Sequence, residues 1–246
     1  MKHHSAWLLS GSVLAGLVFI TNIETRPIPR SSALLQGKRT QMSSPCISDD
    51  EIQTQLRSLS SAHSQPEQEA ARKQLVEVAN KSSECRTQII GAIMRAMDKP
   101  PADLHHDRSR FYLWHYGSEI LAILKAEESL DLLIDHFDLH DGTPFPLNHH
   151  PAVVSVIRMG SPAIPKLDAV LRQSNNPNSR QYAVFCIASI GGPDAQRVLL
   201  QALPSESNQC VKSFITASLA AWDSSRLQIS AERRPDWYAA FLCNTP

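Results

Sequence analysis

The sequence predicts an all-α protein, a right-handed α-α solenoid of about four to five helix pairs. An apolar helix, a turn with glycine and proline and a second helix run from 153 to 171, and the same order returns from 184 to 203, about 31 residues later. Periods of this length are typical of helical solenoids, in which each helix pair buries its apolar face by stacking on its neighbours. The chain has nine glycines and 6% aromatic residues, which also favour helices over a β-sandwich.

Three helices are expected before the repeats, where they would form an N-terminal helical cap (46–104). Ser48 and Glu51 stand three positions apart before an apolar stripe, the pair that caps a helix N-terminus. Pro66 suits the first turn of the second helix, and the third is expected to end before Pro100.

The repeat array, with a C-terminal capping helix, is expected over 105–246. In a further copy of the repeat, Ala126 takes the place that Gly160 and Gly191 occupy in the two clear copies. A fourth unit is expected to begin near Val211, because the residues before it resemble those about 32 positions earlier.

The N-terminal segment (1–23) has the layout of a secretory signal peptide, with a short basic start and an apolar run of about fifteen residues. Such a run spans about 22 Å as a helix, less than the roughly 30 Å hydrocarbon core. A signal peptide is therefore the first interpretation and an uncleaved membrane anchor the second. Residues 24–45 carry prolines and serines without periodicity and are expected to form a disordered linker. We expect an exported protein, periplasmic or membrane-anchored, that meets the membrane only through its N-terminal segment.

The charge distribution argues against nucleic acid as a partner. Five of the 24 basic and one of the 24 acidic residues precede Cys46, which leaves 19 basic and 23 acidic residues in the body of the chain. Nucleic-acid binding depends on Lys and Arg neutralising phosphates, so a mildly acidic body is not expected to bind it.

The five cysteines lack the CxxC spacing of zinc or thioredoxin motifs. In an oxidising compartment Cys46 and Cys85 could join the first helices, and Cys210 and Cys243 the last. Cys186 lies between apolar residues and is expected to be a small apolar filler. Two terminal disulfides are one hypothesis, and five buried free thiols are the other.

Residues 176–203 resemble the HEAT repeat, in particular the short HEAT-like repeats of bacterial proteins and phycobilisome lyases. Residues 160–167 are similar to the turn and second helix of that family, and Val211-Lys212 is similar to its Val-Arg pair. The resemblance covers about 108–222. It implies an α-α superhelix that binds other proteins, and it implies no reaction.

A noncatalytic protein-binding scaffold of the bacterial cell envelope is therefore the predicted function. The second helices of the pairs would form a concave face that holds another protein, with contacts from Lys166, Arg197 and Gln201. The sequence has no phosphate-binding loop, nucleophile elbow or paired catalytic carboxylates. We accordingly assign no catalytic residue, no cofactor and no metal ligand.

Two alternatives remain open. Histidines gather in the irregular segment 136–150, where His136 and His140 would share one face of a helix, and Asp138 and Asp141 could supply carboxylates. This segment could serve a metal-dependent enzyme or a metal-binding protein, or its histidines could simply be solvated. The resemblance to phycobilisome lyases implies the other alternative, a lyase-like cofactor chaperone.

Overall fold

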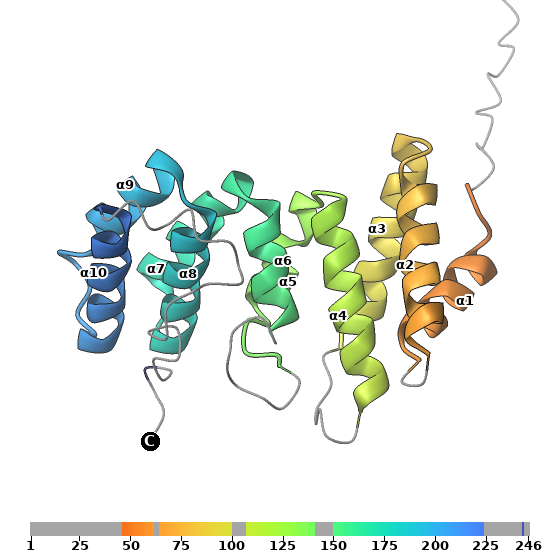
Figure 1. Cartoon of the computed structure of the whole chain (residues 1–246), viewed down its shortest axis with the longest axis horizontal. Helices are drawn as coiled ribbons and strands as arrows, with labels where there is room; N and C mark the ends of the chain where they lie inside the picture. The colour runs from red at the N-terminus through yellow and green to blue at the C-terminus, as the bar shows by residue number, and fades with distance from the viewer. Residues whose placement is uncertain (1–45, 62–63, 100–106, 141–149, 224–242, 244–246) are drawn as a thin grey trace, which may run out of the picture. The chain divides into compact units, whose positions relative to one another are not determined.

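The structure is a computed structural model that describes residues 46–61, 64–99, 107–140, 150–223 and 243. The chain divides into two compact units, 1–42 and 43–246, and every described residue belongs to the second. The expected signal or anchor (1–23) and linker (24–45) lie outside the described residues. Within the described ranges the chain forms ten α-helices and two short 3-10 helices and contains no strand (Figure 1). The all-α prediction is confirmed for this part of the chain.

The first three helices, α1 (Asp49–Leu59), α2 (Gln65–Ala79) and α3 (Ser83–Met97), contact one another. A serine precedes each of them, and its hydroxyl accepts a first-turn backbone N–H. The Ser48 hydroxyl accepts the N–H of Glu51 at 3.1 Å. The predicted start of the first helix is therefore confirmed, and its cap satisfies a donor that the helix itself leaves unpaired.

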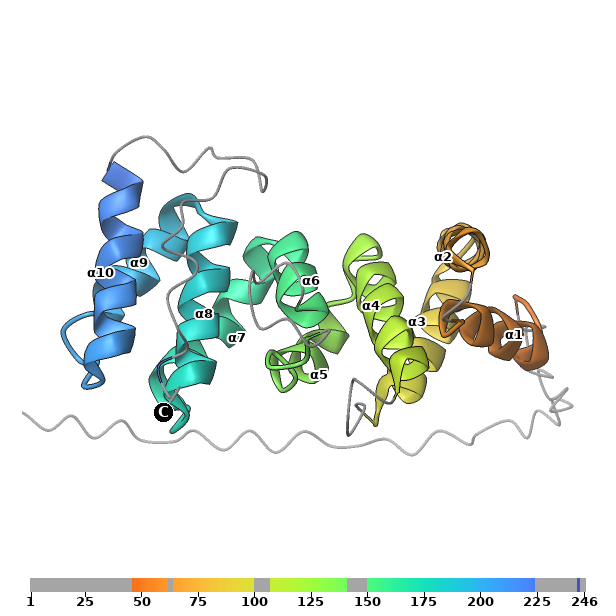
Figure 2. The ribbon, with the colours of Figure 1, turned by 60° about the horizontal axis from the view of Figure 1, so that its bottom comes forward.

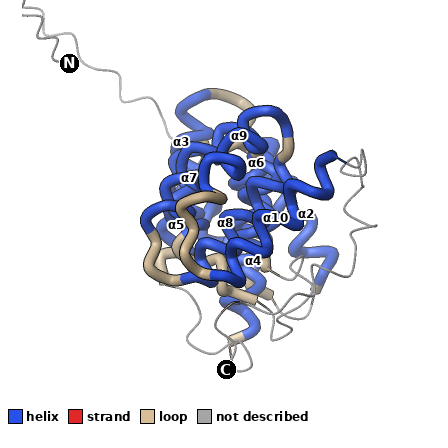
Figure 3. Tube along the Cα trace, turned by 90° about the vertical axis from the view of Figure 1, so that its left-hand side faces the viewer, coloured by secondary structure: helices blue, strands red, loops and turns tan. Residues whose placement is uncertain are grey.

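The remaining helices alternate between two rows. The first-row helices are α4 (Arg108–Ile123), α6 (Pro151–Met159), α8 (Pro177–Ile190) and α10 (Gln209–Asp223). The second-row helices are α5 (Leu130–Ile134), α7 (Ile164–Gln173) and α9 (Gly192–Ala202). Each helix contacts the next member of its own row, and α8 also contacts α7 and α9. Figure 2 shows the first row in succession, and Figure 3, which looks along it, separates α5 and α7 from α8 and α10.

Two turns of the repeat require glycine. Gly160 and Gly191 end the first-row helices α6 and α8, with backbone φ angles of 81° and 74°. Residues with a side chain rarely adopt positive φ. The glycines that mark the repeat in the sequence thus redirect the chain from the first row into the second.

The turn after α4 has the expected alignment, because Ala126 directly precedes the 3-10 helix Glu127–Ser129 as Gly160 precedes Ser161–Ala163. The positive φ, at 51°, lies one residue earlier, at Lys125. The amide of Ala126 donates to the Leu121 carbonyl and that of Lys125 to the Ala122 carbonyl, the pair of bonds that defines a Schellman ending. The Lys125 ammonium also donates to the carbonyl oxygen of Arg158 at the end of α6. A residue in the turn after α4 therefore links its own helix pair to α6 of the next pair.

Helix α5 is short, with five residues, and ends at Ile134. The backbone continues in turns, and the Phe137 carbonyl accepts a bond from the ring of His150 at 2.8 Å. This hydrogen bond links the turn after α5 to the start of α6 in the next helix pair. Among the helices that the structure describes, none combines the length and apolarity needed to cross a membrane.

Candidate functional site

The three predicted contact residues lie on neighbouring second-row helices. Lys166 belongs to α7, and Arg197 and Gln201 belong to α9, which contacts α7. The side chains of Lys166 and Arg197 are 40% and 58% exposed, and Gln201 is exposed. The structure therefore places all three where a second molecule can reach them.

Both cations of this surface have an acidic partner within the chain. Lys166 Nζ lies 2.5 Å from Asp131 Oδ1 and so joins α7 to α5. Arg197 Nη2 lies 2.9 Å from Asp194 Oδ1 on the same helix. Exposed pairs of this kind contribute at most about 1 kcal/mol each. An acidic group on a partner can therefore replace either aspartate at small cost.

Leu200 is a member of this surface that the sequence interpretation missed. Its side chain is 53% exposed, one of two large apolar residues so exposed among the described residues. Arg197, Leu200 and Gln201 stand at i, i+3 and i+4 and share one face of α9. The other face of α9 supplies the buried residues Ala195, Val198, Leu199 and Ala202. The sequence could have indicated this exposure, because Val198, Leu199 and Leu200 are three apolar residues in succession. Only the first two belong to the buried face of α9.

Two of the described histidines of the 136–150 segment, His136 and His150, use a ring nitrogen to bind a backbone carbonyl. His136 Nδ1 lies 2.9 Å from the Leu132 carbonyl, and the buried His150 Nδ1 lies 2.8 Å from that of Phe137. A carbonyl only accepts, so in each ring Nδ1 carries the proton. Across the described ranges no group of three or more His, Cys, Asp or Glu is placed to hold a metal ion. Residues 141–149 lie outside those ranges, and the metal alternative stays a hypothesis that metal analysis of the purified protein tests.

The rings near the start of α6 form a packed cluster. The His150 ring lies 5.2 Å from that of His140 and 5.5 Å from that of Tyr182, and Phe137 lies 5.8 Å from Tyr182. Burial, with a smaller contribution from Asp138, raises the pKa of Tyr182 far above its usual value, so its phenol stays neutral. These contacts join the turn after α5 to α6 and α8, which is a packing role.

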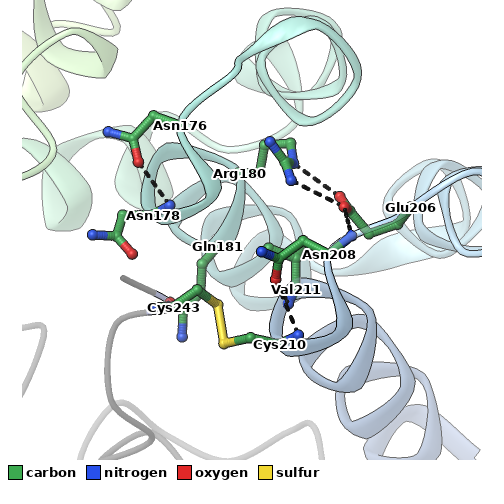
Figure 4. Close-up of a disulfide and its surroundings, with 9 residues drawn as sticks. All are labelled: Asn176, Asn178, Arg180, Gln181, Glu206, Asn208, Cys210, Val211 and Cys243. Atoms are coloured by element: carbon green, nitrogen blue, oxygen red, sulfur yellow. Dashed lines mark hydrogen bonds and ion pairs between the residues drawn. A yellow bond between two sulfur atoms is a disulfide. The ribbon is translucent and has the colours of Figure 1, made fainter. Parts of the chain in front are cut away.

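A buried ion pair joins α8 to the turn before α10 (Figure 4). Arg180 donates from Nε and Nη2 to the two carboxylate oxygens of Glu206, at 2.9 and 3.0 Å, and from Nη1 to the Ser174 carbonyl at 2.8 Å. Glu206 also accepts the backbone N–H of Asn208 at 2.8 Å. The two charged side chains are only 13% and 5% exposed. This bidentate pair, which the sequence interpretation did not identify, fastens two successive first-row helices.

Two disulfides lie near the ends of the folded unit. Cys46 is bonded to Cys85, with Cα atoms 5.2 Å apart, and Cys210 to Cys243, with Cα atoms 5.6 Å apart. Both distances are ordinary for a disulfide, and both pairings are those considered from the sequence. Cys186 is buried in α8 and forms no disulfide.

The purified protein is expected to carry both bridges. Unfolding it in denaturant without a reductant should then expose one reactive thiol per chain, that of Cys186, and prior reduction should expose all five. Thiol titration measures this number directly. Three or five thiols without reduction would show that one or both bridges are absent.

No family model, curated protein or solved structure matches this chain. The fold itself defines the class of this protein: its described part is all-helical, with helices in two contacting rows. Its candidate site is a mixed polar and apolar surface on α7 and α9.

Proposed function

We propose that the protein is a noncatalytic protein-binding scaffold of the HEAT-like type. Its helix pairs stack as an α-α solenoid, and the second-row helices α5, α7 and α9 form the concave face that holds another protein. The unbroken contact of α5 with α7 and of α7 with α9 supports this proposal. Such a succession offers one extended surface to a partner.

The observation that carries the proposal is the surroundings of Leu200. The Leu200 side chain, which is 53% exposed, shares a face of α9 with Arg197 and Gln201, and Lys166 lies on the adjoining helix α7. Protein interfaces bury an apolar centre inside a polar rim, and arginine is enriched in them. The two cations favour a partner with an acidic segment beside an apolar anchor.

The place of action that we propose is the bacterial envelope, with the chain either released into the periplasm or anchored in the membrane. The basic and apolar N-terminal segment supports export. The Cys46–Cys85 and Cys210–Cys243 bridges support an oxidising compartment, where such bonds persist. Fusion of the N-terminal segment to a reporter that is active only after export tests this, and a reporter retained in the cytoplasm would contradict it.

Partner capture from envelope extracts tests the proposed binding face. We expect the double variant Arg197→Glu/Leu200→Asp to lose at least about tenfold in capture of any partner that the unmodified chain enriches, because it removes the apolar anchor and reverses the charge beside it. The measurement is quantitative mass spectrometry of proteins retained by the immobilised full chain.

Ala217→Asp is the matched control, since Ala217 is exposed on the first-row helix α10. This control should retain the same proteins within about twofold. Equal capture by the double variant and the unmodified chain would place the binding surface elsewhere and overturn the proposal.

A further inference from the structure

The two halves of the Cys46–Cys85 disulfide have different surroundings. Cys46 precedes α1 and is half-buried, whereas Cys85 is only 4% exposed and lies in the first turn of α3. A thiolate opens a disulfide by attacking a sulfur that it can reach. The half of this bridge that is open to a thiol from solution is therefore Cys46.

The hydroxyl group of Ser82 lies beside both sulfurs of this bridge. It donates to Cys85 Sγ at 3.2 Å, lies 3.9 Å from Cys46 Sγ and accepts the backbone N–H of Cys85 at 3.2 Å. A hydrogen bond to an ionised acceptor is stronger than one to a neutral acceptor. Ser82 therefore binds a thiolate at Cys85 more strongly than it binds the sulfur of the closed bridge.

The start of α3 acts in the same direction. Cys85 is the third residue of this helix, where backbone N–H groups have no partner within the helix and the helix dipole is positive. Such a position stabilises a thiolate. When the bridge is opened at Cys46, the sulfur that leaves is thus the one whose negative charge the structure stabilises.

The charged residues next to Cys85 in sequence oppose each other. Glu84 is exposed, and hydrogen bonds, first from Ser82 and then from its own backbone N–H, lower the pKa of its carboxyl group. Its negative charge disfavours a thiolate beside it and competes for the Ser82 hydroxyl. Arg86, which donates to the Lys125 carbonyl at 3.2 Å, supplies a positive charge on the other side. The hydroxyl in direct contact with the sulfur therefore decides the balance.

We propose that the Cys46–Cys85 disulfide is a thiol-exchange site whose substrate is a small thiol such as glutathione. The thiolate of the small molecule attacks Cys46 Sγ, the S–S bond breaks, and its electron pair leaves on Cys85 Sγ. The products are a mixed disulfide on Cys46 and a thiolate at Cys85. The sulfur of the small thiol is oxidised and that of Cys85 is reduced, so the step needs no other reactant.

Exchange changes what holds the chain at the start of α1. In the closed bridge Cys46 is covalently joined to α3, and Gln88 Nε2 of α3 donates to the Ile47 carbonyl at 3.0 Å. After exchange the covalent link is lost. This site lies on the first helices, apart from the proposed binding surface on α7 and α9, so either proposal can fail without the other.

Reaction of the full chain with reduced glutathione tests the direction of attack. The reaction is stopped with acid at early times, free thiols are alkylated, and the peptides are identified by mass spectrometry. We expect glutathione on Cys46 with an alkylated Cys85 at least about tenfold more often than the reverse. A mixed disulfide mainly on Cys85, or none on Cys46, would overturn the proposal.

The variant Ser82→Asp tests the role of the hydroxyl. Aspartate also caps helices, but it replaces the donor beside Cys85 with a negative charge. We expect the mixed disulfide on Cys46 to form about fivefold more slowly, because the Cys85 thiolate leaves less readily. The matched control Ser64→Asp makes the same change at the cap of α2 and should react at the rate of the unmodified chain.

Uncharged 2-mercaptoethanol separates this effect from repulsion of anionic glutathione by the new carboxylate. The Ser82→Asp variant should be slowed by a similar factor with either thiol, because the leaving sulfur is the same. Slowing with glutathione alone, or equal rates for Ser82→Asp and the unmodified chain, would show that Ser82 does not stabilise the leaving thiolate and would contradict the proposal.

Discussion

Replacing Trp114 with alanine is expected to lower the free energy of unfolding by about 3–5 kcal/mol. Trp114 is fully buried in α4, and its ring lies 4.7 Å from that of His136, which follows α5. Its indole N–H is buried and has no hydrogen-bond partner among the described residues. The substitution therefore removes no hydrogen bond, and the loss reports the packing of the buried ring against its neighbours, His136 among them. Urea denaturation of the full chain measures it.

The matched control is Ile123→Ala on the same helix. Ile123 is 42% exposed, so its truncation should change stability by less than about 0.5 kcal/mol. Similar losses at Trp114 and Ile123 would show that α4 does not pack as described here.

Replacing Arg180 with alanine is expected to cost about 3 kcal/mol, because it leaves a buried carboxylate without its cation. The Glu206 side chain, which is 5% exposed in the intact pair, would keep only the Asn208 N–H as a donor, and the Ser174 carbonyl would lose its bond to Arg180. The change in the free energy of unfolding can be measured by urea denaturation monitored by circular dichroism.

Two further variants make this prediction specific. Arg180→Met/Glu206→Leu removes both charges and should recover most of the loss, since apolar residues of similar volume often replace a buried pair without penalty. Arg197→Ala breaks a pair whose members are 58% and 69% exposed and should cost less than about 1 kcal/mol. Equal losses for Arg180→Ala and Arg197→Ala would contradict the burial of the Arg180–Glu206 pair.

The parts of the fold that the sequence predicts depend on residues a few positions apart. The cap of α1 needs only Ser48 and Glu51, and the turns after α6 and α8 need a residue that tolerates positive φ, which Gly160 and Gly191 provide. Lys125 adopts positive φ without being glycine or asparagine, so residue type gave no warning of it. The alignment at Ala126 is nevertheless confirmed, since Ala126 directly precedes a 3-10 helix as Gly160 does, and only the place of the positive φ was not predicted.

The parts that the sequence does not predict depend on what lies beside a helix. Apolar periodicity alone does not distinguish Leu200, which is exposed, from Leu199, which is buried. Nor does it show that Gln181 is buried, with its side-chain oxygen accepting the N–H of Cys243, 62 positions further along the chain. The same limit applies to Arg180, whose partner stands 26 residues away.

The two rows have different roles in this account. First-row helix α8 is fixed to α10 and to Cys243 by the Arg180–Glu206 pair, a disulfide and the Gln181 bond. Second-row helix α9 keeps an accessible apolar group beside polar ones. The buried ion pair and the disulfide of this end thus lie on the first row, and the proposed binding surface lies on the second.

The central claim is that each helix pair is stabilised by its immediate neighbours, as in a solenoid. Native-state hydrogen exchange of the Trp114→Ala variant tests it most directly. We predict faster exchange in α4 and in the helices that contact it, α1, α2, α3 and α6, with α10 as protected as in the unmodified chain, because damage to one pair should reach only the elements that touch it. An equal rise in exchange from α1 to α10 would instead indicate one indivisible core and would contradict the account.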